Sequence, residues 1–108
     1  PMPPEEANLK LIPFLAKKFR CKVGYSGHEA AATNVSIPAI LLGAASIERH
    51  VTIDRTAFGH DQAASLEPKG LIQLVRDIRI VDKIMGDGKK RVWKSELNSK
   101  NKLRQKFV

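Results

Sequence analysis

Three stretches of the chain place apolar residues at the spacing of an amphipathic helix. Residues 1–19 open with prolines and acids suited to a helix N-terminus, and they predict a helix that is kinked at Pro13 or restarts after it. Residues 34–44 predict a short helix that ends at Gly43. The largest apolar face belongs to residues 66–85 and comprises Leu71, Leu74, Val75, Ile78, Val81 and Met85.

Two strand-length runs alternate with these helices. Residues 21–26 form a short run that Gly27 ends, and residues 46–54 are rich in β-branched side chains. The order helix, strand, helix, strand, helix predicts an α/β fold of two parallel strands and three helices with right-handed crossovers. Three helices and two strands cannot cover both faces of a parallel sheet. We therefore expect the chain to be a piece of a larger fold. We also expect residues 66–85 to pack on both strands, so that Val75→Asp would unfold the chain.

Composition indicates a soluble globular protein. The chain has 108 residues, enough for one modest domain, of which 43% are hydrophobic and 28% are charged. A single cysteine, Cys21, excludes an internal disulfide and a cysteine-cluster metal site, and it fits a reducing compartment. No apolar run approaches the roughly 20 residues of a membrane-spanning helix. These features predict a cytoplasmic protein that does not contact a membrane.

The positive charge is concentrated at the C-terminus. The net charge is +8, and residues 87–108 contribute +6 of it because they contain eight Lys and Arg residues and only two acidic residues. A basic tail is more often a solvated segment than a nucleic-acid site, and few aromatic residues are available to stack on bases. We therefore expect residues 89–108 to be mobile or weakly helical. The alternative is a non-catalytic module that binds nucleic acid or an acidic partner through this tail.

Two histidines follow the predicted strands, one in "GYSGHE" and the other in "ASIERH". Strand alternation places Ser26 and His28 on one face of the first strand, and Glu48 and His50 on one face of the second. If the strands are parallel neighbours, both imidazoles lie at C-terminal strand ends, where α/β folds place their active sites. Two such imidazoles can bind a divalent metal, with Asp61 as a candidate ligand or base.

Each of these residues also has a simpler interpretation. Histidines without helical or zinc-finger spacing are usually hydrogen-bonded structural residues. Ser26 can be an ordinary turn residue, and Glu48 can simply form an ion pair with Arg49 or a lysine. Glu29 is expected on an exposed loop.

Four motifs, in this order, closely resemble the C-terminal part of the catalytic barrel of the N-acetylneuraminate (sialic acid) synthase family: "VGYSGHE", "LGAASIERHVTIDR", "GHDQAASLEP" and "LVRDIRIVDKIMGDGKKRV". The likeness covers nearly all of residues 3–95. It implies that residues 1–86 are a C-terminal fragment of a (β/α)8 TIM barrel, with its sixth helix and its seventh and eighth β/α units. Residues 87–108 would then be a basic linker leading to a C-terminal antifreeze-like domain.

The resemblance also implies a chemistry. The family condenses phosphoenolpyruvate with an N-acetylmannosamine-type sugar to give a nine-carbon sialic acid and phosphate, and the full-length enzymes are expected to be homodimers. His28 and His50 match the two histidines that bind a divalent cation, typically manganese. Ser26 matches a contact to the phosphate of phosphoenolpyruvate, and Asp61 matches the acidic residue near the metal-bound water and the sugar.

This sequence departs from the family pattern between the two histidines. The intervening segment is one residue longer than usual, lacks a glycine that the family generally has shortly after the first histidine, and carries Pro38 where alanine is usual. The lysines that grip phosphoenolpyruvate, a barrel glutamate and the arginine of the C-terminal domain have no counterpart in residues 1–108. We therefore expect the chain to be inactive by itself.

Overall fold

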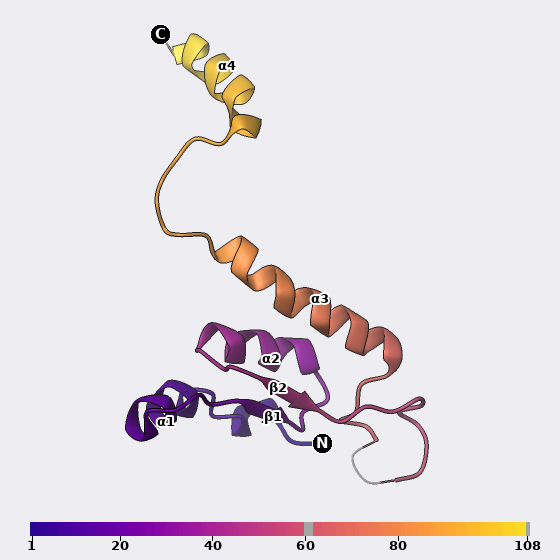
Figure 1. Cartoon of the computed structure of the whole chain (residues 1–108). Coiled ribbons are helices and arrows are strands. Elements are labelled where there is room, and N and C mark those ends of the chain that lie inside the picture. The colour runs from indigo at the N-terminus through magenta and orange to yellow at the C-terminus, as the bar shows by residue number, and fades with distance from the viewer. Residues whose placement is uncertain (60–61, 108) are drawn as a thin grey trace.

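The computed structural model describes residues 1–59 and 62–107. Helices and strands alternate along this part of the chain, as the sequence predicts (Figure 1). In order, the elements are η1 (Pro4–Glu6), α1 (Leu11–Phe19), β1 (Tyr25–Gly27), α2 (Ala32–Leu41), β2 (Ile47–Arg49), α3 (Pro68–Met85), η2 (Lys94–Glu96) and α4 (Leu97–Phe107). The described residues thus contain four α-helices and not the three expected, because the C-terminal segment forms α4.

The break in the first predicted helix lies earlier than expected. A single turn of 3-10 helix, η1, precedes a separate helix α1 that begins at Leu11, before Pro13. Proline is tolerated in the first turn of a helix because the backbone N–H groups there have no intrahelical acceptor. Pro13 therefore lies at a helix start, and the interruption falls between Glu6 and Leu11.

Strands β1 and β2 pair in parallel, which confirms the predicted direction. The register aligns Tyr25 with Ile47, Ser26 with Glu48 and Gly27 with Arg49. Both strands are shorter than the sequence suggested, although the Ala45 amide still donates to the Val23 carbonyl at 2.8 Å ahead of the ladder. Just after β2, an isolated parallel bridge joins Val51 to Leu66.

Helix α2 lies on one face of the two strands, and α3 packs chiefly on α2 (Figure 1). The sequence-based expectation that α3 packs on both strands, with Val75 in the interface, is wrong in this respect. Leu74 and Val81 are the buried residues of α3, whereas Val75 is 36% exposed. The physical reason is that α2 already covers the strand face that α3 would need.

The core beneath α2 is small. Its buried members, Ile12, Ala39 and Ala44, come from α1, α2 and the segment before β2. Partly buried apolar side chains pack around them: Leu9, Val23, Tyr25, Ile40 and Ile47. This core fixes α1 and α2 against the strands, and it thereby positions the strand ends.

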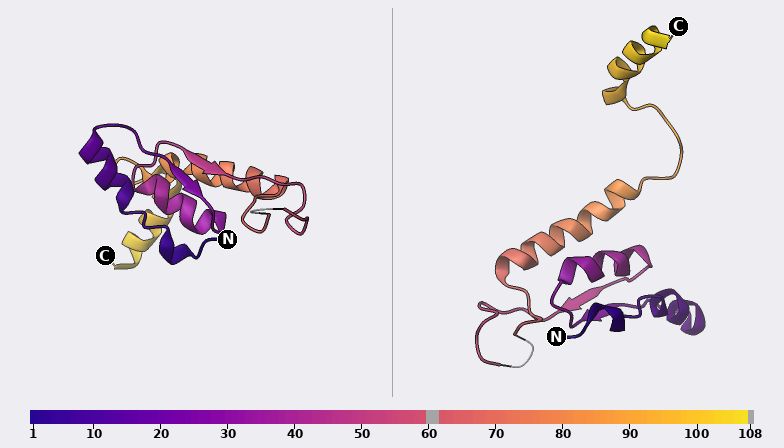
Figure 2. Two further views of the ribbon diagram at one scale, coloured as in Figure 1. Left: turned by 90° about the horizontal axis from the view of Figure 1, so that it is seen from below. Right: turned by 180° about the vertical axis from the view of Figure 1, so that it is seen from behind.

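The C-terminal helix stands apart from these layers. Among the helices and strands, α4 packs with η2, and it projects away from the rest of the molecule (Figure 2). The described atoms span 66 × 38 × 21 Å. A helix around residues 95–107 agrees with the weak helical tendency in the sequence. Among the described residues, no helix is both long enough and apolar enough to cross a membrane.

Candidate functional site

Four polar side chains gather on one face of the paired strands and at their C-terminal ends. We call Ser26, His28, Glu48 and His50 the site face. Ser26 and Glu48 are register partners, and His28 and His50 are the first residues after β1 and β2. The imidazole centroids are 5.3 Å apart, with the ring planes inclined at 58°. The structure therefore brings together the two histidines that lie 22 residues apart in the sequence.

Glu48 has a different partner from the one expected. Its Oε1 accepts a hydrogen bond of 2.8 Å from the Ser26 hydroxyl, so it does not pair with the adjacent arginine. Since the hydroxyl proton points at Glu48, the lone pairs of the Ser26 oxygen are left to accept from other donors. Sequence reasoning missed this role of Glu48, although a parallel register that aligns the two histidines also places Glu48 opposite Ser26.

The two imidazoles fit a shared divalent cation. Metal–nitrogen bonds are about 2 Å long, so a centroid spacing of 5.3 Å is compatible with one ion between the rings. Within residues 1–59 and 62–107, no third His, Cys, Asp or Glu completes such a cluster. Asp61, the predicted catalytic residue, lies outside the described residues. The described site is thus two nitrogen donors, which leave the remaining coordination positions to carboxylates, water or substrate.

The longer segment between the histidines does not separate them. After a bend at residues 29–30 the chain enters α2, which contains Pro38 in its interior. Proline lacks the N–H that would bond to a carbonyl one turn earlier, yet the helix continues to Leu41. Pro38 is therefore accommodated within α2, and the histidines at either end of the segment still approach each other.

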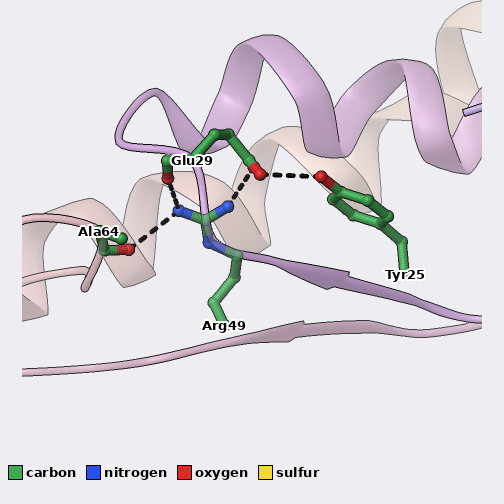
Figure 3. Close-up of polar contacts among 4 residues, drawn as sticks. All are labelled: Tyr25, Glu29, Arg49 and Ala64. Atoms are coloured by element: carbon green, nitrogen blue, oxygen red, sulfur yellow. Dashed lines mark hydrogen bonds and ion pairs between the residues drawn. The ribbon is translucent and has the colours of Figure 1, made fainter. Parts of the chain in front are cut away.

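Directly behind the site face, the opposite face of the strands carries a buried polar network (Figure 3). Glu29 is fully buried and forms an ion pair with Arg49, whose side chain is 3% exposed. The second guanidinium nitrogen of Arg49 donates to the carbonyl of Glu29 and, at 3.1 Å, to that of Ala64. We call Arg49, Glu29 and the Ala64 carbonyl the arginine clamp.

The burial of Glu29 corrects the expectation that this residue lies on an exposed loop. Its other carboxylate oxygen accepts a hydrogen bond of 2.8 Å from the hydroxyl of Tyr25. The alternation of Tyr25, Gly27 and Glu29 along one strand face was the signal that could have revealed the network. It could not be used, because a glutamate is almost always solvent-exposed unless it has a buried partner, and the sequence near Glu29 does not show one.

Tyr25 gives this network a measurable signature. Burial and the neighbouring Glu29 carboxylate raise the pKa of Tyr25 from 10.0 to about 12. Because the folded pKa lies above the unfolded one, the Tyr25 contribution to stability is complete below pH 10 and is lost as the pH rises towards 12. Tyr25→Phe should abolish this component of the pH dependence and should cost about 1–3 kcal/mol at neutral pH through the lost hydrogen bond.

Urea unfolding at several alkaline pH values, for the wild type and Tyr25→Phe, measures this difference. Tyr25 is the only tyrosine of the chain, so tyrosinate absorbance reports its titration directly. A Tyr25 that titrates at the ordinary pH, with parallel stability curves for the two proteins, would contradict the network.

The chain is similar in sequence to a known family of synthases. Residues 1–90 match the model of the NeuB family. The chain is 41% identical over 109 residues to N-acetylneuraminate-9-phosphate synthase of Mus musculus, covering 100% of this chain and 30% of that protein. It is 43% identical over 108 residues to N,N'-diacetyllegionaminic acid synthase of Campylobacter jejuni subsp. jejuni, covering 100% of this chain and 32% of that protein.

Solved structures agree with these relatives. The crystal structure of an N-acetylneuraminic acid synthetase from Leptospira borgpetersenii in complex with citrate superposes with a TM-score of 0.74 at 38% identity, over 94% of this chain and 35% of that one. A spore coat polysaccharide biosynthesis protein, SpsE, from Bacillus subtilis gives a TM-score of 0.75 at 38% identity, over 87% of this chain and 27% of that one. The chain spans about a third of the length of the curated relatives that it matches.

Proposed function

Because the chain belongs to the NeuB family, we propose that it forms the metal-binding part of a sialic acid-type synthase barrel. The observation that carries the proposal is the adjacency of His28 and His50, with centroids 5.3 Å apart, at neighbouring parallel strand ends. In this proposal β1 and β2 are the seventh and eighth strands of a (β/α)8 barrel, and α1, α2 and α3 are the sixth, seventh and eighth helices. The likeness to longer synthases supports this placement.

The proposed reaction joins phosphoenolpyruvate to an N-acylated mannosamine-type sugar. A carbon–carbon bond forms between C3 of phosphoenolpyruvate and the sugar aldehyde carbon, water adds at C2, and inorganic phosphate leaves. A divalent cation, manganese in this proposal, would polarise the aldehyde oxygen when bound. The proposal includes these two substrates, and it includes a homodimeric full-length enzyme.

The residues of this chain have separate tasks in that reaction. Neutral imidazoles of His28 and His50 would supply nitrogen ligands and fix the position of the cation. The Ser26 hydroxyl donates a hydrogen bond of 2.8 Å to Glu48. Its oxygen would remain available to accept a hydrogen bond from a protonated phosphate or from water. Asp61 would orient the water that adds to C2. The comparisons give no support to the alternative of nucleic-acid binding through the basic tail.

Metal binding tests the proposal directly. We expect the chain to bind Mn2+ weakly, because two nitrogen ligands without a full surrounding shell leave an open site. His28→Ala and His50→Ala should each weaken binding by about tenfold or more. Titration of Mn2+, followed by the electron paramagnetic resonance signal of the free ion, measures the affinity. Asp82→Asn, an exposed carboxylate on α3, is the matched control and should bind as the wild type does.

The same preparation should not release phosphate from phosphoenolpyruvate with N-acetylmannosamine. Phosphoenolpyruvate carries several negative charges, and the four side chains of the site face include no Lys or Arg. Preorganised positive groups supply much of the stabilisation in such transfers, so their absence should leave only the background rate.

Mn2+ affinity indifferent to both histidine substitutions would contradict the proposed site.

A further inference from the structure

We propose that the arginine clamp is a positioning device: Arg49 and Glu29 hold His28 and His50 at the spacing at which the two imidazoles can share a cation. This inference rests on the proposed function. Arg49 and Glu29 do not point at the cation site, so they would act through the histidines.

The order of the residues along the chain couples the ion pair to the histidines. Glu29 directly follows His28, and Arg49 directly precedes His50. Successive side chains of a strand point to opposite faces, so Arg49 at the end of β2 points away from the face of His50, and the Glu29 carboxylate meets it there. A restraint between Glu29 and Arg49 on one face is therefore also a restraint on the distance between the histidines on the other.

The ladder between β1 and β2 ends before the histidines begin. Strand β1 ends at Gly27 and β2 ends at Arg49. The His28 carbonyl accepts from the Met2 amide at 2.9 Å, and the His50 carbonyl accepts from the Leu66 amide at 2.8 Å. These bonds tie each histidine to a different outer segment. Besides the Ser26–Glu48 hydrogen bond, the arginine clamp joins the two strand ends through side chains, and its residues are the sequence neighbours of the two histidines.

The guanidinium group of Arg49 restrains several partners at once. Arg49 is bound to the Glu29 carboxylate, the Glu29 carbonyl and the Ala64 carbonyl, so it connects both strand ends with the segment after residue 61. Tyr25 holds the second carboxylate oxygen, which fixes Glu29 from the other side. A planar, multiply bonded guanidinium restrains orientation as well as distance, whereas a lysine ammonium acts as a point charge.

Gly27 provides the space for this arrangement. A Cβ atom at Gly27 would overlap the Arg49 guanidinium and would lie 2.9 Å from Arg49 Cδ and 3.0 Å from Glu29 Oε1. The backbone of Gly27 does not have a positive φ, so the requirement for glycine is steric and not conformational. Even an alanine at this position must displace the clamp.

Stability alone is a weak explanation for the clamp. Burying two charges costs several kcal/mol of desolvation, and replacing a buried ion pair with well-packed apolar residues is often neutral or stabilising. An ion pair that fixes one arrangement of two flanking ligands has a use that apolar packing lacks, because apolar contacts are non-directional.

The experiment compares Arg49→Lys and Gly27→Ala with the wild type. Arg91→Lys, in an exposed ion pair, and Gly70→Ala, whose added Cβ would meet only Leu66 Cδ2 at 3.4 Å, are the matched controls. We measure Mn2+ affinity and, without metal, the nuclear Overhauser contacts between the rings of His28 and His50. Circular dichroism and Tyr25 titration verify that each variant is folded and report whether Glu29 has moved.

Arg49→Lys and Gly27→Ala should lower Mn2+ affinity about 10-fold or more, as loss of outer-shell support does at other metal sites, and should weaken the inter-ring contacts. The controls should change neither. Folded variants that keep the affinity, or keep the inter-ring contacts while losing affinity, would overturn the positioning role. Failure of the wild type to bind Mn2+ through His28 and His50 would instead refute the proposed function, a separate result. If Arg49→Lys does not fold, Gly27→Ala decides, because it retains both charges.

Discussion

Arg49→Met should lower the free energy of unfolding by about 3–5 kcal/mol, because it leaves the Glu29 carboxylate buried without its partner. Glu29 is 0% exposed and the side chain of Arg49 is 3% exposed, so water cannot replace the lost contacts without local opening. Urea unfolding followed by circular dichroism at neutral pH measures the change. For a domain of ordinary stability, a loss of this size is a large fraction of the total.

The chain contains a matched control for this substitution. Arg91 forms an ion pair with Asp87, and these side chains are 41% and 52% exposed. Solvent screens exposed pairs of this kind, so Arg91→Met should have little effect on the free energy of unfolding. Equal effects of the two arginine substitutions would show that Arg49 is not buried in an ion pair.

The double variant Glu29→Met/Arg49→Met separates stability from positioning. Removing both charges also removes the unpaired buried charge, so much of the lost stability should return. The Mn2+ affinity should not return, because apolar side chains cannot restrain the two strand ends as the guanidinium does.

Leu74→Ala should have the second large effect, a loss of about 2–5 kcal/mol, because it leaves a cavity between α3 and α2. Leu74 is 3% exposed, and with Val81 it forms the buried stripe of α3. Val75 is the control: it is the next residue in the sequence but is 36% exposed, and Val75→Ala should cost less than about 1 kcal/mol.

The same contrast revises the expectation from sequence that Val75→Asp would unfold the chain. A carboxylate at a position 36% exposed can reach water, so the variant should keep its helical circular dichroism, whereas Leu74→Asp should lose it. Similar urea midpoints for the Leu74 and Val75 alanine variants would refute the packing of α3 on α2.

Local pattern was enough to predict the elements that carry the site. The alternation of helical and strand-like runs predicted parallel strands, and period-two alternation placed Ser26 with His28, and Glu48 with His50. These features follow from backbone geometry over a few residues, so they can be inferred without knowledge of the rest of the molecule. The NeuB relationship was equally visible, because its motifs retain their order in the sequence.

Tertiary structure alone decided how these pieces meet. The register of β1 against β2 pairs Gly27 with Arg49, and only this pairing places the guanidinium over a residue without a side chain. The burial of Glu29 depends on Arg49, Tyr25 and Ala64, which come from three separate segments. Likewise, α2 covers the strands and leaves α3 to pack on α2, with Leu74 buried. A charged residue can be buried only where distant groups satisfy it, and the sequence near Glu29 does not contain all of those groups.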